Sequence, residues 1–369
     1  VASGQSLAAD SPLYRICRRI GVVEQPVRPT SARMVDTLLS AKPDMALRLG
    51  SDEMDALVTE WVASGDYDLV QSEGIEMASF GMLAQEVAAA NGHPVRFIFD
   101  DHNCEYLLQK RNALTDLRSL RRSPAGIYSV IQWQKLVRYE REICRRADRV
   151  LAVSEPDAAA LRALGSDLQV EVVLNGIDLD AYTPTEAVEP PPEVLVFSGK
   201  MDYRPNIDAV LWFADEVLPH ILSTRAQARF QIVGQAPHAR LDRLRDNPAI
   251  EITGAVADVR PYLSGAGVYV MPLRVGGGTR FKALEAMALG KAIVTTSLGV
   301  EGIDVQNGRE LMIVDDPALF AQAVLTLLDT AQAQLRAHLA RAARSHVAQV
   351  YDWQEIIGGL NHLYMHLTS

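Results

Sequence analysis

The densest chemical signal is the segment Pro272–Leu289, PLRVGGGTRFKALEAMAL, which holds three consecutive glycines. It follows the apolar run Val268–Met271 and leads into a strongly helical run, so the order is strand, glycine loop, helix. Glycine lets a phosphate approach the backbone, and a helix start offers unbonded N–H groups and the positive end of its dipole. We therefore interpret Gly276, Gly277 and Gly278 as an anion site.

Polar residues continue directly after the glycines. Thr279 can cap the helix, while Arg280 and Lys282 bring positive charge to the same end, which suits a group with at least two negative charges. Lys282 and Glu285 share a helix face three residues apart. The alternative interpretation is therefore a surface ion pair worth roughly 0.3 kcal/mol.

Other common motifs are missing from the sequence. Neither the Walker pattern G-x-x-x-x-G-K-[ST] nor the dinucleotide pattern G-x-G-x-x-G occurs, and H-E-x-x-H and C-x-x-C are absent as well. The eight histidines form no cluster at metal-ligand spacing. We expect no metal site and no cofactor.

The elements that must position these residues form two similar halves. Apolar runs of strand length alternate with helical periodicity, which predicts parallel sheets covered by helices, and 369 residues suggest two domains. The proline-rich stretch Ala181–Glu193 marks the boundary. We predict an N-terminal domain over 1–183, a second domain over 184–345, and a C-terminal helix over 346–369 that returns to the N-terminal domain.

The predicted elements can be placed by residue number. Strands are expected at Tyr67–Val70, Val95–Phe99, Arg149–Val153, Val170–Leu174, Val194–Ser198, Phe230–Val233, Ile250–Thr253, Val268–Met271 and Ala292–Thr295. Helices are expected at Met54–Ala63, Gly81–Ala90, Tyr128–Arg146, Asp208–Leu222, Pro317–Ala343 and His346–His362. Ligands of such domains bind in the crevice at the carboxyl ends of the strands.

Composition excludes several classes of protein. The chain is 48% apolar and 22% charged, and no apolar run approaches the ~18 residues of a membrane span. A net charge of −10 argues against nucleic acid binding, and three cysteines argue against a disulfide framework. These features predict a cytoplasmic location. The chain begins with Val1 and lacks a signal peptide pattern, so we expect a segment upstream.

Several blocks of sequence together resemble a known enzyme family. They are Phe197–Phe213 (FSGKMDYRPNIDAVLWF), Phe230–Gly234, Ile252–Leu263 and Val270–Ile303, with Phe99–Arg111 and Val173–Tyr182 in the first half. They resemble the group 1 sugar transferases, which are GT-B glycosyltransferases of family 4. The resemblance implies an α/β fold of two doubly wound Rossmann-like domains facing a cleft. It also implies metal-independent transfer of a sugar from a nucleoside diphosphate, with retention at the anomeric carbon.

The resemblance assigns roles in the second half. Glu285 matches the second acid of the family's E-x7-E motif and would bind the ribose hydroxyls, whereas Gly277 stands where the first acid would be. Lys282, with Arg280 and Arg204, matches the cations that neutralise the leaving diphosphate. Val256 and Arg260 match the segment with which members of the family contact the nucleotide base. For Arg260, an ion-paired structural role is the alternative.

The resemblance also assigns a role in the first half. His102 follows a predicted strand end and matches the family's histidine near the sugar, where it could position the acceptor. A purely structural histidine is the alternative. We interpret Asp100 and Asp101 as loop or capping residues, and the D-x-D of Asp178 and Asp180 as structural.

One departure from the family lies at the start of the chain. The family's first domain opens with a strand and a glycine-containing loop, and neither precedes the segment VASGQSLAADSPLYRICRRI at residues 1–20. We therefore expect the first domain to lack its opening strand and glycine loop, with part of the acceptor site.

Three functions compete. The first is a retaining glycosyltransferase acting on a glycan or lipid-linked acceptor for cell-surface or exported polysaccharide. The alternatives are a nucleotide-sugar binding protein without turnover and a nucleotide-sugar epimerase.

The distribution of charge along the chain suggests one further partner. Residues 110–149 hold eleven basic and four acidic residues, a net +7, which leaves −17 for the rest of a chain of net charge −10. Apolar residues such as Leu117, Leu120 and Trp133 lie among these cations, including Arg118, Arg121 and Arg122. We expect either peripheral contact with an anionic membrane or a solvated helix face.

Overall fold

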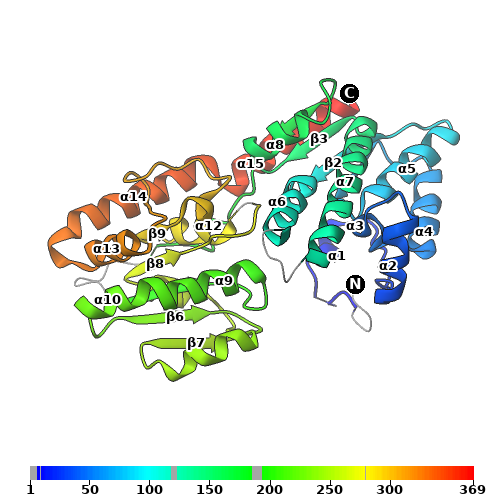
Figure 1. Ribbon diagram of the computed structural model, residues 1–369. Helices are drawn as coiled ribbons and strands as arrows, with labels where there is room; N and C mark the ends of the chain where they lie inside the picture. Colours follow the sequence, from blue (N-terminus) through cyan, green and yellow to red (C-terminus); the bar gives the residue numbers. More distant parts are fainter. Residues whose placement is uncertain (1–5, 9, 118–122, 185–192, 279) are drawn as a thin grey trace. The chain divides into compact units, whose positions relative to one another are not determined.

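The computed structural model describes residues 6–8, 10–117, 123–184, 193–278 and 280–369. Contacts divide the chain into unit 1, which comprises Val1–Val173 and Asn361–Ser369, and unit 2, which comprises Leu174–Leu360. Figure 1 shows the helices and strands of both. Each unit contains a parallel sheet flanked by helices, so the predicted α/β class is confirmed.

Unit 1 contains a four-stranded parallel sheet of order β1-β2-β3-β4 in the described residues. Before the first strand come α1 (Leu13–Ile16), α2 (Thr30–Leu39), α3 (Asp44–Leu47) and α4 (Asp52–Ala63). The rest of the unit runs β1 (Leu69–Glu73), α5 (Ala78–Ala90), β2 (Arg96–Asp101), α6 (Glu105–Leu117), α7 (Ser123–Arg146), β3 (Arg149–Ala152), α8 (Glu155–Arg162) and β4 (Val170–Val172).

Polar side chains cap the starts of α4 and α6. The Ser51 hydroxyl accepts from the Met54 N–H at the start of α4. The buried Glu140 carboxylate of α7 accepts from the N–H groups of Glu105 and Tyr106 at 2.9 and 2.6 Å, so one helix caps the next. A carboxylate at a helix start pairs with both the unbonded N–H groups and the dipole.

Unit 2 contains a six-stranded parallel sheet of order β10-β9-β8-β5-β6-β7. Its elements are β5 (Val194–Ser198), α9 (Arg204–Trp212), a π-helical turn (Phe213–Val217), α10 (Leu218–Thr224), β6 (Arg229–Val233), a 3₁₀ helix (Ala239–Asp246), β7 (Ile250–Gly254), α11 (Arg260–Gly265), β8 (Val268–Met271), α12 (Phe281–Ala288), β9 (Ile293–Thr295), a 3₁₀ turn (Ser297–Val300), β10 (Met312–Ile313), α13 (Pro317–Leu328), a 3₁₀ turn (Thr330–Gln332), α14 (Ala333–Val350) and most of α15 (Trp353–Thr368).

Both faces of the second sheet are buried. Leu195 and Phe197 of β5 pack into one apolar cluster with α9, α10 and α13, while Val196 packs into another with α12 and α14. Successive side chains of a strand point to opposite faces, so a sheet covered twice requires the continuous apolar runs seen in the sequence.

Two helix predictions were wrong. The helix expected over Pro317–Ala343 ends at Leu328, because the Asp329 side chain accepts from the Ala331 N–H and starts a new turn. The helix expected over His346–His362 begins only at Trp353. There Ile177 donates its N–H to the Tyr351 carbonyl and accepts from the Trp353 N–H, which interrupts the helix.

The last residues of the chain, Asn361–Ser369, belong to unit 1. The Tyr364 hydroxyl donates to Gln71 Oε1 of β1, and Arg96 Nε of β2 donates to the Leu367 carbonyl. Most of the predicted linker, residues 185–192, lies outside the described residues.

Candidate functional site

The strand order of unit 2 changes direction between the paired strands β5 and β8. From β5 the chain continues outward on one side through β6 and β7, and β8 returns to the other side of β5. Ligands of open parallel sheets bind outside the carboxyl ends of the strands at such a switch point. Gly199 directly follows β5, and the glycine loop 276–278 follows β8.

Close contacts at the carboxyl ends of β5 and β6 leave no room for a Cβ atom, so glycine is required at positions 199 and 234. A Cβ at Gly199 would lie 2.7 Å from Asn206 Nδ2 and 2.9 Å from Lys282 Nζ. A Cβ at Gly234, which follows β6, would lie 1.7 Å from the Gly199 carbonyl oxygen. The backbone at this edge of the sheet is therefore in direct contact with polar side chains.

The predicted glycine loop has the conformation that glycine favours. Gly276 and Gly278 have φ of 104° and 79°, in the region that other residues rarely adopt. At Gly276 a Cβ would also lie 2.9 Å from Pro205 Cγ of α9. The loop thus lies against the start of α9 and leads into α12, which begins at Phe281.

Lys282 is half-buried in this site. Its ammonium donates to Asn206 Oδ1 at 2.7 Å and lies 4.3 Å from the centre of the Phe197 ring. Burial and the nearby charge of Arg280 lower the pKa of Lys282 to about 7, against an opposing effect of Glu285. No ion pair joins Lys282 to Glu285 in the described part of the chain, so the surface-pair interpretation was wrong.

Asn206 is a site residue that the sequence reasoning did not assign. It is buried at the start of α9, and its Nδ2 donates to the Lys200 carbonyl at 2.9 Å. With Oδ1 bound to Lys282, the amide positions the ammonium relative to the end of β5. The signal was present in the quoted block, where Asn206 stands in RPNID.

Glu285 also has a fixed partner. The Tyr182 hydroxyl donates to Glu285 Oε1 at 2.8 Å. Burial raises the pKa of Glu285, whereas the Tyr182 hydrogen bond and the Lys282 charge oppose that shift. Arg344 of α14 donates to the carbonyls of Tyr182 and Ala288, which fixes the Tyr182 segment against α12. Tyr182 was not assigned from the sequence either, although it ends the quoted block VLNGIDLDAY.

The remaining predicted residues of unit 2 lie in different environments. Arg280 is buried, and its guanidinium donates to the Gly277 and Leu298 carbonyls, so it braces the glycine loop. Arg204 is the exposed first residue of α9. Val256 packs against the apolar cluster that includes α12. Thr279 lies outside the described residues.

Two further residues of unit 2 that the sequence analysis discussed have structural partners. Arg260 is ion-paired with Asp258 at 2.8 Å and donates to the Ala181 carbonyl, as in its structural interpretation. Asp178 Oδ1 accepts from the N–H groups of Asp180 and Ala181, which is a turn-forming arrangement.

His102 lies in unit 1, directly after β2. Its side chain is 51% exposed, and its Nε2 lies 3.9 Å from Glu73 Oε2. It lines a cavity of about 700 Å³ whose other walls come mainly from apolar residues of α4, β1 and α5, among them Met54, Trp61 and Phe80. The histidine therefore stands at a polar edge of an apolar cavity.

The interpretation of Asp100 and Asp101 as loop or capping residues was wrong. Both belong to β2, because their backbones pair with Leu151 and Ala152 of β3. Asp101 is 1% exposed, and burial together with the charge of Glu140 raises its pKa well above the usual range. Among the described residues, no group of three or more His, Cys, Asp or Glu side chains could hold a metal ion.

Two family models match the sequence. Residues 29–181 match the model described as Glycosyltransferase Family 4, and residues 192–330 match the model described as Glycosyl transferases group 1. The chain belongs to the group 1 and family 4 glycosyltransferases. The resemblance predicted from the sequence blocks is thereby confirmed.

Curated relatives of this glycosyltransferase are distant. A phosphatidyl-myo-inositol mannosyltransferase of Mycobacterium tuberculosis (strain ATCC 25618 / H37Rv) is 26% identical over 323 residues, which are 83% of this chain and 76% of that protein. An uncharacterized 44.6 kDa protein in the cps region of Klebsiella pneumoniae is 23% identical over 174 residues. That match covers 45% of this chain and 44% of the Klebsiella protein, less than half of its length.

Solved structures share the fold. A glycosyltransferase from Rickettsia africae ESF-5 has a TM-score of 0.62 at 14% identity, covering 94% of this chain and 85% of that one. HepE from Anabaena, in complex with UDP and glucose, has a TM-score of 0.59 at 16% identity and covers 84% and 81%. These neighbours are GT-B glycosyltransferases, so the predicted GT-B fold is confirmed.

Proposed function

We propose that this glycosyltransferase moves a sugar from a nucleoside diphosphate sugar to a glycan or lipid-linked acceptor, with retention of anomeric configuration and without a metal. The observation that carries the proposal is the position of Lys282 at the switch point of unit 2. Its ammonium is held by Asn206 beside the backbone of Gly199, next to a glycine loop. A diphosphate leaving group needs such a cation, because negative charge grows on it in the transition state.

The roles of the other donor residues follow from their surroundings. The Glu285 carboxylate has one oxygen on Tyr182 and can accept a ribose hydroxyl hydrogen bond with the other. Gly276, Gly277 and Gly278 would bring backbone N–H groups to the phosphates, and Arg204 would add charge from the start of α9. Arg280 supports the loop through its bond to the Gly277 carbonyl.

The acceptor would bind in unit 1. The cavity beside His102 is large enough for a drug-sized group, and its apolar walls suit the apolar part of a lipid-linked acceptor. The His102 imidazole can exchange a hydrogen bond with a sugar hydroxyl. A Mycobacterium relative named as a phosphatidyl-myo-inositol mannosyltransferase supports this class.

We further propose a cytoplasmic enzyme of surface polysaccharide synthesis that makes peripheral contact with the inner membrane face through residues 110–149. No helix of the described residues combines the length and apolar character needed to cross a membrane. Some cations of the stretch have other contacts, because Arg141 donates to the Leu164 carbonyl and Arg146 pairs with Glu86. Arg118, Arg121 and Arg122 lie outside the described residues.

A donor screen followed by a release assay tests the proposal. We expect one UDP- or GDP-sugar to raise the melting temperature and to release free nucleoside diphosphate when a mixed glycan and lipid extract is added. EDTA should change neither result. Loss of donor binding in EDTA with recovery in magnesium would contradict the metal-independent chemistry. Donor binding without release would indicate a binding protein, and sugar interconversion without free diphosphate would indicate an epimerase.

A further inference from the structure

The carboxyl ends of β1 and β2 place two acidic side chains next to each other. Glu73 of β1 is in register with Asp100 of β2, so both side chains lie on the same face of the sheet. Like charges at directly opposite positions of neighbouring strands destabilise a sheet. The groups around these two carboxylates must therefore offset their repulsion.

His102 is the first of these groups. Its Nε2 lies 3.9 Å from Glu73 Oε2. Burial raises the pKa of Asp100, while the charge of His102 opposes that shift and the charge of Glu73 adds to it. The histidine thus interacts with both carboxylates.

Gln71 is the second group, and both ends of its amide are bound. Its Nε2 donates to Asp100 Oδ2 at 3.1 Å, and its Oε1 accepts from the Tyr364 hydroxyl at 2.5 Å. A carboxylate only accepts hydrogen bonds, so it requires the N–H end of the amide. The Tyr364 hydroxyl requires the oxygen end in turn, and it thereby fixes which end of Gln71 faces Asp100.

Tyr364 lies on α15, 293 positions after Gln71. Burial and the charges of Asp100 and Glu73 raise the pKa of Tyr364, so the hydroxyl keeps the proton that it donates. Within the part of the chain that the structure describes, Gln71, Glu73 and His102 line the cavity proposed for the acceptor, whereas Tyr364 does not. Any effect of Tyr364 on a bound acceptor therefore passes through these residues.

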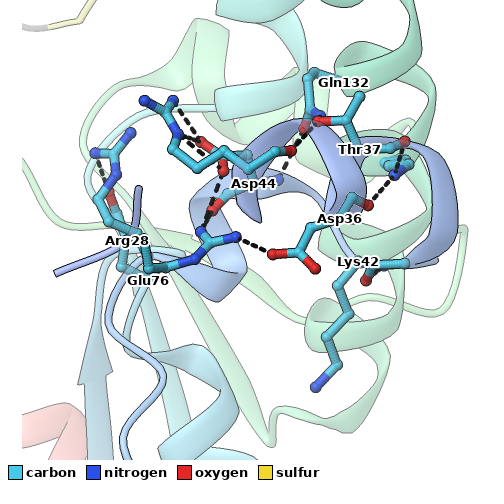
Figure 2. Close-up of polar contacts among 11 residues, drawn as sticks. Arg28, Asp36, Thr37, Lys42, Asp44, Glu76 and Gln132 are labelled. Carbon is cyan, nitrogen blue, oxygen red and sulfur yellow. Dashed lines mark hydrogen bonds and ion pairs between the residues drawn. The ribbon is translucent and has the colours of Figure 1, made fainter. Parts of the chain in front are cut away.

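A further acid, Glu76, lies near His102 but is paired elsewhere. A Cβ at Gly74 would lie 3.7 Å from His102 Nδ1 and 3.5 Å from Glu76 Oε2. Arg48 donates to Glu76 Oε1 at 3.1 Å, and Figure 2 shows Glu76 together with the hydrogen bonds around Asp44. Glu76 has a cation of its own, so the carboxylates of β1 and β2 are the ones that act on the histidine.

We propose that Tyr364 is a positioning residue for sugar transfer, which acts on His102 through Gln71 and Asp100. The proposal rests on the proposed function, because it assumes that His102 meets the acceptor. With its amide held by Tyr364, Gln71 directs an N–H group at Asp100 and keeps that carboxylate in place beside His102. Without the hydroxyl, the amide is free to turn its oxygen toward the carboxylate, and the two oxygens repel each other.

The first test compares Tyr364→Phe with Tyr106→Phe in the full chain. Tyr106 is the matched control, because its hydroxyl also donates one hydrogen bond within unit 1, to the Ala160 carbonyl at 3.0 Å. We expect Tyr364→Phe to lower the turnover number of transfer about fivefold, the effect of one lost hydrogen bond, and to leave donor affinity unchanged. The control should keep the wild-type turnover number.

A double-mutant cycle separates positioning from a structural role. In the His102→Ala background, Tyr364→Phe should lower turnover no further, because the residue on which it acts is missing. A purely structural tie between α15 and β1 would instead lower turnover by the same factor in both backgrounds. That result, or a wild-type turnover number in Tyr364→Phe, would overturn the proposal.

A second measurement needs no activity. The Cε1–H resonance of His102, one of eight histidines, can be assigned by its loss from the NMR spectrum of His102→Ala. It should move in Tyr364→Phe, which keeps the aromatic ring and loses only the hydroxyl, and stay in place in Tyr106→Phe. An unmoved resonance in Tyr364→Phe would overturn the proposal. If wild type transferred no sugar, the proposed function would be contradicted, and this resonance would still decide whether Tyr364 acts on His102.

Discussion

At the scale of residues, the lowered pKa of Lys282 makes donor binding depend on pH. The pKa of about 7 means that the ammonium is charged before binding below pH 7, whereas above pH 7 binding must take up a proton. A terminal phosphate, with a second pKa of about 6, is already ionised in this range. We predict that the affinity for nucleoside diphosphate falls by up to about tenfold per pH unit between pH 7 and 9.

Titration calorimetry of two variants checks this prediction. Lys282→Arg keeps its charge throughout, so its affinity should stay constant with pH. Lys291→Arg is the matched control, because Lys291 is another half-buried lysine, with a pKa lowered to about 8, that donates to the Ser264 carbonyl. It should retain the wild-type pH dependence, and a flat wild-type profile would exclude titration of Lys282.

At the scale of elements, the close approach of β5 and β6 at their carboxyl ends positions the donor site. A Cβ at Gly234 would lie 1.7 Å from the Gly199 carbonyl oxygen, and both groups are backbone, so neither can move without shifting a strand end. We predict that Gly234→Ala lowers the free energy of unfolding by about 3 kcal/mol, as severe overpacking does. Urea unfolding measures the change.

The matched control for this element is Gly265→Ala at the end of α11, where a Cβ would meet nothing within 4 Å. It should change stability by less than about 1 kcal/mol. If Gly234→Ala were as stable as this control, the predicted clash between a Cβ at position 234 and the Gly199 carbonyl oxygen would be contradicted. Nucleotide binding by the folded fraction of Gly234→Ala should also weaken, because Gly199 contacts Lys282 and Asn206.

At the scale of the whole molecule, the candidate residues are divided between the two units. His102 belongs to unit 1, whereas the glycine loop, Lys282 and Glu285 belong to unit 2. We therefore predict that His102→Ala keeps the donor affinity of wild type and loses about a hundredfold or more in transfer rate. Calorimetry and a transfer assay on one preparation separate the two effects, with exposed His238→Ala as control. Unchanged transfer would leave His102 with a structural role.

The amino-acid sequence by itself determined the features that depend on local pattern. Continuous apolar runs such as Val194–Ser198 predicted strands buried on both faces, and the strand coincides with β5. The glycine loop before α12 was also visible, because strand, glycines and helix follow one another within one segment. The blocks that resembled group 1 transferases identified the family for the same reason, since a motif is a local string.

Only the tertiary structure decided which distant residues meet. Tyr182 reaches Glu285 across 103 positions, and Asn206 reaches Lys282 across 76, which no periodicity reveals. The burial of Asp101 depended on the pairing of β2 with β3, and the exposure of the apolar side chains of α2 depended on bonds from Gln132 and Lys135 of α7. Hydrophobic pattern shows which face of a helix is apolar, but the polar partners supplied by the rest of the chain decide whether that face turns inward.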